Sequence, residues 1–205
     1  MLVLDKPSNL LSVPGRGDDK QDCLSSRVQK YYSNASVVHR LDMGTSGLML
    51  MARGATAQRI FNHAFASRAV HKLYEAVVDG LLKQPVMDDD DNWQVINLPI
   101  ALDWPNRPRR VIDMNLGKPS QTRWEMISVD ATSRTSRLRL SPVTGRSHQL
   151  RVHLMAIGHP ILGDKLYAPS AVANQSDRLL LHATRLELIH PVSQQPIRFE
   201  SPAPF

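Results

Sequence analysis

Two short stretches of the sequence gather polar side chains of the types that active sites use. The first, at 38–48, reads V-H-R-L-D-M-G-T-S-G-L and places Arg40 two residues before Asp42. The second, at 142–153, crowds two arginines, two histidines and a glutamine around a turn and an expected helix start. A carboxylate can act as a nucleophile or proton acceptor, and a neighbouring guanidinium favours its charged form. A polar active site is therefore plausible, although a lone Asp near an Arg normally forms only a salt bridge.

Other kinds of site are not supported by the sequence. It has no G-x-x-x-x-G-K-[ST] phosphate-binding loop, no G-x-S-x-G around Ser46 and no H-E-x-x-H pair. His148 and His153 are five residues apart, which on a helix separates them by about 140°. Cys23 lies among apolar residues at helical spacing, so we expect a buried structural thiol rather than a catalytic one. We expect no metal site.

The charge points to a polyanionic partner. The formal net charge is +6, and outside the acidic run at 88–91 the balance is 25 − (19 − 4) = +10. A pI of about 9.8 is typical of nucleic-acid-binding proteins, although charge alone does not separate RNA from DNA or an acidic membrane surface. We expect the acidic run to be a solvated loop. One cysteine and the lack of a long apolar run predict an intracellular, cytoplasmic protein without membrane spans.

Short strand-like runs dominate the sequence, with a few helical windows between them. On a strand at 37–41, Arg40 and Asp42 would point to the same side. Strands and helices do not alternate strictly and no linker divides the chain, so we expect one α+β domain, residues 1–205, with a mixed, mostly antiparallel sheet. The expected strands are 2–4, 37–41, 47–52, 70–78, 95–100, 121–128, 135–140, 179–181, 186–189 and 197–199, and the expected helices are 19–32, 55–67 and 147–157.

The polar stretches also resemble a known family. H-R-L-D-x-x-T-S-G-L at 39–48 is similar to the catalytic motif of the RluA-type pseudouridine synthases. The segment D-W-P-N-R-P at 103–108 resembles the members that act on both tRNA and 23S rRNA. Further family blocks follow in order at 72–80, 117–119, 144–151, 158–164, 180–183 and 190–191. The resemblance covers nearly the whole chain and implies a catalytic domain with a central RNA-binding cleft flanked by a few helices.

The family's reaction breaks the bond between ribose C1′ and uracil N1, turns the base over and joins C1′ to C5. No atoms are gained or lost, so the resemblance implies no cofactor. It assigns Asp42 as the catalytic carboxylate, Arg146 as the arginine that keeps it ionised, and Tyr74 as the tyrosine that stacks on uracil and removes the C5 proton. Asp42 could attack C1′, add to the base or take the C2′ proton. Arg40 is expected to hold a phosphate or to help keep the base extruded.

The uridine must leave its stack to react, and basic residues beside aromatic ones supply phosphate contacts and stacking surfaces. For Tyr74 the alternative is a half-buried strand aromatic, and for the group at 104–110 it is a solvated basic turn. For Arg151 and Lys165 the alternative is a salt bridge. The expected RNA-contacting residues are Trp104, Arg107, Arg109, Arg110, Arg151 and Lys165.

The sequence as a whole predicts an enzyme that forms pseudouridine in structured RNA, in 23S rRNA, tRNA anticodon stem-loops or both. The alternative is a non-catalytic basic RNA-binding or chaperone protein on the same fold. A DNA-binding module ranks last, because no recognition-helix signature is present. Some relatives carry an S4-like RNA-binding domain ahead of the catalytic fold. This sequence starts close to the first strand, so either this member is short or its start lies upstream. A monomer is the default expectation.

Overall fold

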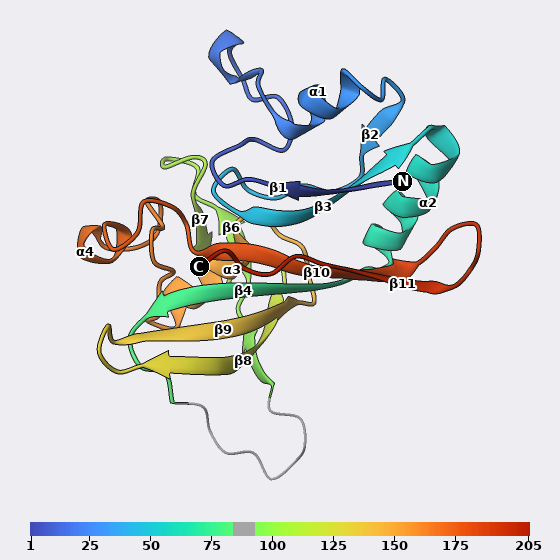
Figure 1. The fold of residues 1–205 in the computed structure, drawn as a ribbon. Coiled ribbons are helices and arrows are strands. Elements are labelled where there is room, and N and C mark those ends of the chain that lie inside the picture. The colour runs from blue at the N-terminus through green and yellow to red at the C-terminus, as the bar shows by residue number, and fades with distance from the viewer. Residues whose placement is uncertain (84–92) are drawn as a thin grey trace. The chain divides into compact units, whose positions relative to one another are not determined.

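The computed structural model describes residues 1–83 and 93–205, and the acidic run at 88–91 lies outside them. The described chain forms two compact units (Figure 1): unit 1 contains residues 1–72 and 182–205, and unit 2 contains residues 73–181. The elements in chain order are β1 (Leu2–Lys6), η1 (Asp18–Lys20), α1 (Leu24–Gln29), β2 (Ala35–Val37), β3 (Ser46–Arg53), α2 (Ala55–Ala66), β4 (His71–Asp79), β5 (Gln94–Asn97), β6 (Ile100–Leu102), β7 (Arg110–Ile112), β8 (Gln121–Asp130), β9 (Thr135–Pro142), α3 (Gln149–Ala156), α4 (Ser170–Ala173), β10 (Leu181–Ile189) and β11 (Pro196–Glu200).

Unit 1 is built around β3, which is buried along nearly its whole length. β1 and β2 pair with it antiparallel, β10 pairs with it parallel, and β11 pairs antiparallel with β10. A strand that is buried on both faces reads as a continuous apolar run, which explains G-L-M-L-M-A at 47–52. The core joins Leu48 and Leu50 of β3 to Phe61 of α2 and Leu186 of β10.

Unit 2 contains an antiparallel sheet in the order β4-β9-β8-β5. One face carries the core, in which Leu138 and Leu140 of β9 and Trp124 of β8 pack with Leu150 and Leu154 of α3. On β9 these leucines alternate with Arg137 and Arg139, which pair with Glu75 and Glu125. A second, two-stranded sheet pairs β6 with β7.

The α+β class and the mostly antiparallel sheet are confirmed, but the expected strand at 37–41 is wrong. β2 ends at Val37, and the residues from 38 to 45 form an irregular segment. The physical reason is that Leu41 hydrogen-bonds to the Ser12 hydroxyl through both its backbone N–H and its C=O. Those groups are therefore not available to a strand partner. Arg40 and Asp42 therefore lie on a loop that Ser12 holds in place, and they do not share the face of a strand.

Three other expectations differ from the structure. The strands expected at 179–181 and 186–189 form one strand, β10. The helix expected at 19–32 is reduced to α1, and Cys23 caps its start by accepting the Ser26 N–H at 3.4 Å. Cys23 is buried, as expected, but as a helix cap. The strand expected at 95–100 is divided by Pro99, which has no N–H to donate, into β5 and β6. No helix in the described part of the chain is long and apolar enough to cross a membrane.

Position 47 requires a glycine, because the backbone of β10 comes so close to β3 there that no side chain fits. The φ of Gly47 is +106°, and a Cβ at this position would lie 2.4 Å from the Ala183 carbonyl oxygen. We expect Gly47→Ala to combine backbone strain of about 1–3 kcal/mol with a steric clash of similar size. Gly54→Ala is the matched control, because Gly54 also has a positive φ of +82° but has nothing near its Cβ position.

Urea unfolding of the two variants separates these contributions. Gly54→Ala should lose about 1–3 kcal/mol from its backbone conformation alone, because φ +82° with ψ 162° is a region that almost only glycine adopts. Gly47→Ala should lose a further 1–3 kcal/mol or so because of the clash. Equal losses for the two variants would contradict the proposed role of the close approach to Ala183.

Candidate active site

The loop that carries Asp42 is held by side chains from the N-terminal segment of unit 1. The Ser12 hydroxyl donates to the Leu41 carbonyl at 2.6 Å and accepts the Leu41 N–H at 3.1 Å. The Ser8 hydroxyl donates to the Gly44 carbonyl at 2.7 Å. Within the loop, the Thr45 N–H donates to the Asp42 carbonyl at 3.1 Å. The half-buried Asp42 therefore sits on a backbone that is fixed from both sides.

A buried lysine closes this framework. Lys6, at the end of β1, is fully buried, and its ammonium donates to the carbonyls of Leu10 (2.7 Å), Pro7 (2.9 Å) and Met43 (3.1 Å). Met43 directly follows Asp42. A buried ammonium is tolerated only where hydrogen bonds or charges replace its water shell. The requirement to satisfy Lys6 thus ties the Asp42 loop to the turn that follows β1.

His39 fixes the other end of the loop. Its Nε2 accepts the Leu50 N–H of β3 at 2.8 Å, and its ring stacks on Phe65 of α2 with centroids 4.4 Å apart. An accepting Nε2 carries no proton, so the ring is neutral with its proton on Nδ1. Burial, and secondarily the charge of Lys72, lowers the pKa of His39 from 6.5 to about 3. His39 is therefore a structural histidine and not an acid or base near neutral pH.

A second polar chain lies at the start of β3. Ser201 donates to the Asp5 carboxylate at 2.5 Å and lies 3.1 Å from His182 Nε2, while His182 Nδ1 lies 2.7 Å from the Ser46 hydroxyl. With Ser201 donating to Asp5, the consistent direction runs from Ser46 through His182 and Ser201 to Asp5. These bonds join β3, β10 and β1 of unit 1 directly after the Asp42 loop.

In unit 2, Tyr74 and Arg146 are held differently. Tyr74 lies on β4 opposite Leu140 of β9 and packs, half-buried, against the core. Arg146 is exposed just before α3, its backbone N–H donates to Gln149 Oε1 at 3.1 Å, and its guanidinium donates to the Pro119 carbonyl at 3.4 Å. Gln149 also bonds to Thr144 and to the start of β8, which makes this turn rigid.

Tyr167 organises the basic residues of unit 2. Its ring lies 4.9 Å from the Arg151 guanidinium and 5.8 Å from that of Arg109. Its hydroxyl accepts the Arg110 N–H at 2.9 Å and lies 2.6 Å from His148 Nδ1. The aromatic ring and hydroxyl thus connect the 103–110 segment to the start of α3. Tyr167 lies outside the family blocks, three residues after Asp164, so no motif predicts its role.

The predicted RNA-contacting residues separate into two groups. Arg151 is buried and forms a two-pronged salt bridge with Asp164, at 2.8 and 2.6 Å, so the structure shows its salt-bridge alternative. Lys165 is exposed beside this pair. On the 103–110 segment, Trp104 is 66% exposed, and the guanidinium of the exposed Arg107 lies 4.7 Å from its ring. Arg40 and Arg109 are also exposed, and Arg110 is half-buried.

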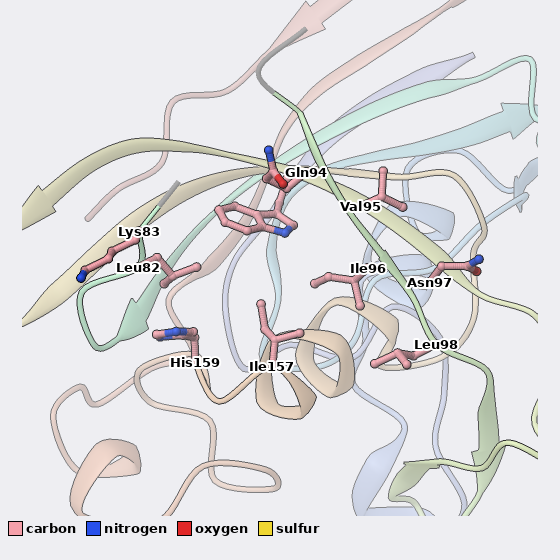
Figure 2. A pocket seen from close by; sticks show the side chains of 10 residues that line it. Leu82, Lys83, Gln94, Val95, Ile96, Asn97, Leu98, Ile157 and His159 are labelled. Atoms are coloured by element: carbon pink, nitrogen blue, oxygen red, sulfur yellow. The ribbon is translucent and has the colours of Figure 1, made fainter. Parts of the chain in front are cut away.

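Unit 2 also contains a pocket of about 480 Å³ that is lined by none of the predicted site residues. Figure 2 shows Ile96, Leu98 and Ile157 in its wall, with His159 at one side. Its wall includes Lys83 and Gln94, which lie at or next to the residues where the described chain stops and resumes, Lys83 and Trp93. We therefore assign it no ligand. Among residues 1–83 and 93–205, no three His, Cys, Asp or Glu side chains lie close enough to hold a metal ion.

The neutral His39 makes a prediction for stability against pH. Between pH 6.5 and about 3 the unfolded chain protonates this ring and the folded chain does not. The free energy of unfolding should therefore fall as the pH falls through this window, by up to about 1.4 kcal/mol per unit. In His39→Gln the side-chain carbonyl can still accept the Leu50 N–H, so this variant should show a smaller slope in urea unfolding between pH 7 and pH 4.

The slope should not vanish in His39→Gln. Burial also lowers the pKa of His153, against the opposing effect of the Leu98 carbonyl. An identical slope in wild type and His39→Gln would contradict the assignment. The Cε1 chemical shift of His39 gives an independent check, since it should remain that of a neutral ring at pH 5.

Comparison with known proteins agrees with the motif order. Residues 1–156 match the family model described as RNA pseudouridylate synthase. The chain is 43% identical over 205 residues to the Dual-specificity RNA pseudouridine synthase RluA of Escherichia coli K12, covering all of this chain and 90% of the relative. It is 45% identical over 204 residues to the protein of the same name from Pasteurella multocida Pm70, again covering all of this chain and 90% of the relative.

A solved structure extends the agreement to three dimensions. Human RNA Pseudouridylate Synthase Domain Containing 1 superimposes with a TM-score of 0.76 at 26% identity, covering 99% of this chain and 80% of the human chain. The sequence motifs, the match over most of the chain and the shared fold agree with one another. The chain belongs to the RNA pseudouridylate synthase family.

Proposed function

We propose that this protein isomerises specific uridines to pseudouridine in structured RNA, and that residues 1–205 act as one catalytic domain. The observation that carries the proposal is the fixed loop at 39–45, in which the side chains of Lys6, Ser8, Ser12 and His39 hold the backbone around one half-buried carboxylate. Preorganised geometry of this kind is what a reaction at a single ribose carbon requires. A non-catalytic RNA-binding protein would have no need for it.

Asp42 is the proposed catalytic carboxylate. The reaction breaks the N1–C1′ bond and forms a C5–C1′ bond, while a proton leaves C5 and one ends on N1. Three routes use a carboxylate: attack on C1′, addition to the base, and removal of the C2′ proton. Each of them needs Asp42 ionised and its position fixed. The bonds from Lys6 and Ser12 to the neighbouring peptide groups supply the fixed position.

Tyr74 and Arg146 are the proposed partners in the reaction. We assign Tyr74, on a rigid strand, to stacking on the uracil and to removal of the C5 proton. We assign Arg146 to stabilising the charged form of the carboxylate, because a guanidinium attracts a nearby negative charge. The anchoring of Arg146 by Gln149 and Pro119 supports a positioning of this kind.

The proposed substrates are 23S rRNA, tRNA anticodon stem-loops or both, encountered in the cytoplasm by a monomer. The exposed Arg40, Arg107, Arg109 and Lys165 support phosphate contacts, and Trp104 supports stacking on an unpaired base. The bacterial relatives are named as dual-specificity RNA enzymes, which supports more than one RNA target. Arg151 is left out of this set, because its guanidinium is occupied by Asp164.

The test is release of tritium from RNA labelled at uracil C5, with tRNA and rRNA offered separately. Wild type should release tritium, and Asp42→Asn, which keeps the size of the side chain but removes its charge, should lose at least about a thousandfold in rate. Asp18→Asn is the matched control, since Asp18 is an exposed carboxylate of the same unit. It should retain full activity.

Two results would contradict the proposal in different ways. If Asp42→Asn released tritium as fast as wild type, the carboxylate would be wrongly assigned even though the reaction was right. If wild type released none from either RNA but still bound RNA with strong salt dependence, the non-catalytic alternative would be favoured. Heat-denatured RNA should react more slowly than folded RNA if loop shape is recognised.

A further inference from the structure

A rigid turn follows β7, at residues 113–117. The Gly117 N–H donates to the Asp113 carbonyl at 3.0 Å. The Asp113 carboxylate accepts the backbone N–H groups of Leu116 and Asn115, each at 2.9 Å. These two bonds, that from Leu116 first, lower the pKa of Asp113, so the carboxylate that holds the turn is charged at neutral pH. The shape of the turn is therefore set before any partner arrives.

The base of this turn is tied to β6. Ile100 and Lys118 exchange both of their backbone hydrogen bonds, at 3.0 and 2.9 Å, and the Asp113 N–H donates to the Pro99 carbonyl at 3.1 Å. The turn is also tightly closed, because a Cβ on Gly117 would lie 2.2 Å from the Asp113 carbonyl oxygen. β6 and β7 in turn pack on α3 and Tyr167 through the cluster that contains Ile100 and Val152.

This turn presents two large apolar side chains to water. Met114 is 73% exposed and Leu116 is 82% exposed. Single exposed apolar residues are ordinary. Here, however, the backbone that carries both side chains is closed by hydrogen bonds from the N–H groups of Asp113, Asn115, Leu116 and Gly117. Exposing two large apolar side chains to water costs free energy, and a fixed turn cannot reduce this cost by rearranging. Such a feature indicates a binding surface.

The surroundings of the turn fit an RNA and not an apolar protein face. Residues 100–120 carry four basic and two acidic side chains, a balance of 4 − 2 = +2. Lys118 directly follows the turn and is exposed. Arg146 donates to the carbonyl of Pro119, two residues beyond the turn, at 3.4 Å. The loop at the other end of the β6–β7 hairpin displays Trp104, which is 66% exposed. Positive charge beside exposed apolar side chains matches phosphates and base faces together.

We propose that the turn at 113–117 is an apolar wedge: Met114 and Leu116 insert between neighbouring bases of the substrate RNA and hold open the stack that the uridine leaves. This inference rests on the proposed function, because only an enzyme acting on a base needs that base extruded. Leucine and methionine side chains inserted at a base step partly unstack it in nucleic-acid complexes. Lys118 holds a phosphate that flanks the opened step.

The direct test measures unstacking without requiring catalysis. An RNA hairpin carrying 2-aminopurine beside a loop uridine is mixed with wild type and with Met114→Ser/Leu116→Ser, at protein concentrations that saturate binding. Wild type should raise the 2-aminopurine fluorescence, because the base loses its stacking neighbour, and the serine variant should lose most of this rise. Met114→Leu/Leu116→Met keeps the apolar bulk and should restore it.

Single-turnover rates distinguish the wedge from a purely structural role of Met114 and Leu116, which would not change the rates in the same way. Two labelled hairpins are compared, one with a stacked loop and one whose loop is already opened by a mismatched closing pair. The serine variant should react at least about tenfold more slowly with the stacked loop and within about threefold of wild type with the opened loop, since unstacking costs a few kcal/mol per step.

Val192→Ser is the matched control, because Val192 is 85% exposed on the β10–β11 hairpin and is part of no proposed site. It should behave as wild type in both measurements. All variants should keep the wild-type melting temperature, since the changed side chains are on the surface. If the serine variant melts at a lower temperature than wild type, the Met114→Leu/Leu116→Met variant decides instead. It must then match wild type in both assays.

The wedge is overturned by an unchanged fluorescence rise in the serine variant, or by equal loss of rate on both hairpins. It is also overturned if the serine variant keeps all RNA readouts but loses binding to phosphatidylglycerol vesicles, which would assign the projection to a membrane surface. If wild type opens the hairpin but forms no pseudouridine in any RNA, the proposed function fails while the wedge stands. If wild type does not open the hairpin, the wedge fails whatever the catalytic result.

Discussion

The position of the reactive loop depends on one buried charge. Lys6 is fully enclosed, and its ammonium is bound to three backbone carbonyls, one of which belongs to Met43 in the Asp42 loop. Removing an ammonium from water is costly unless each proton finds an acceptor, so the surrounding carbonyls must stay where they are. Irregular backbone with few ladder bonds would otherwise be mobile. Here the desolvation of Lys6 makes such a backbone as fixed as a strand.

Two other side chains also fix a loop through their hydrogen bonds. His39 is kept neutral by burial so that Nε2 can accept a strand N–H, and Tyr167 uses its hydroxyl for a backbone N–H of the basic segment. In both cases an aromatic side chain connects a loop to a packed helix or strand. Loops held in this way have their side chains in position before a large, flexible substrate binds, so binding does not have to order them.

The sequence predicted the regular elements and the motif residues better than the connections between them. Buried strands such as β3 and the alternation on β9 have their own local patterns, so these elements were found. The expected strand at 37–41 begins with two valines, but Leu41 is bound by Ser12, 29 residues away, and the chain leaves the strand after Val37. No local pattern reports such a bond. Tyr167 and Lys6 were missed for the same reason, since their partners lie 57 and 37 residues away.

The distribution of ion pairs explains how a basic chain concentrates its charge. Arg137, Arg139 and Arg151 are neutralised by neighbouring acidic side chains, Glu75, Glu125 and Asp164. Among the described residues, Arg107, Arg109, Arg146 and Lys118 form no salt bridge, and all four lie on loops. Positive charge that is not neutralised within the protein is what releases counterions from a phosphate backbone. The excess positive charge of the sequence therefore lies on particular loops, because acidic residues on the strands neutralise the arginines of the sheet.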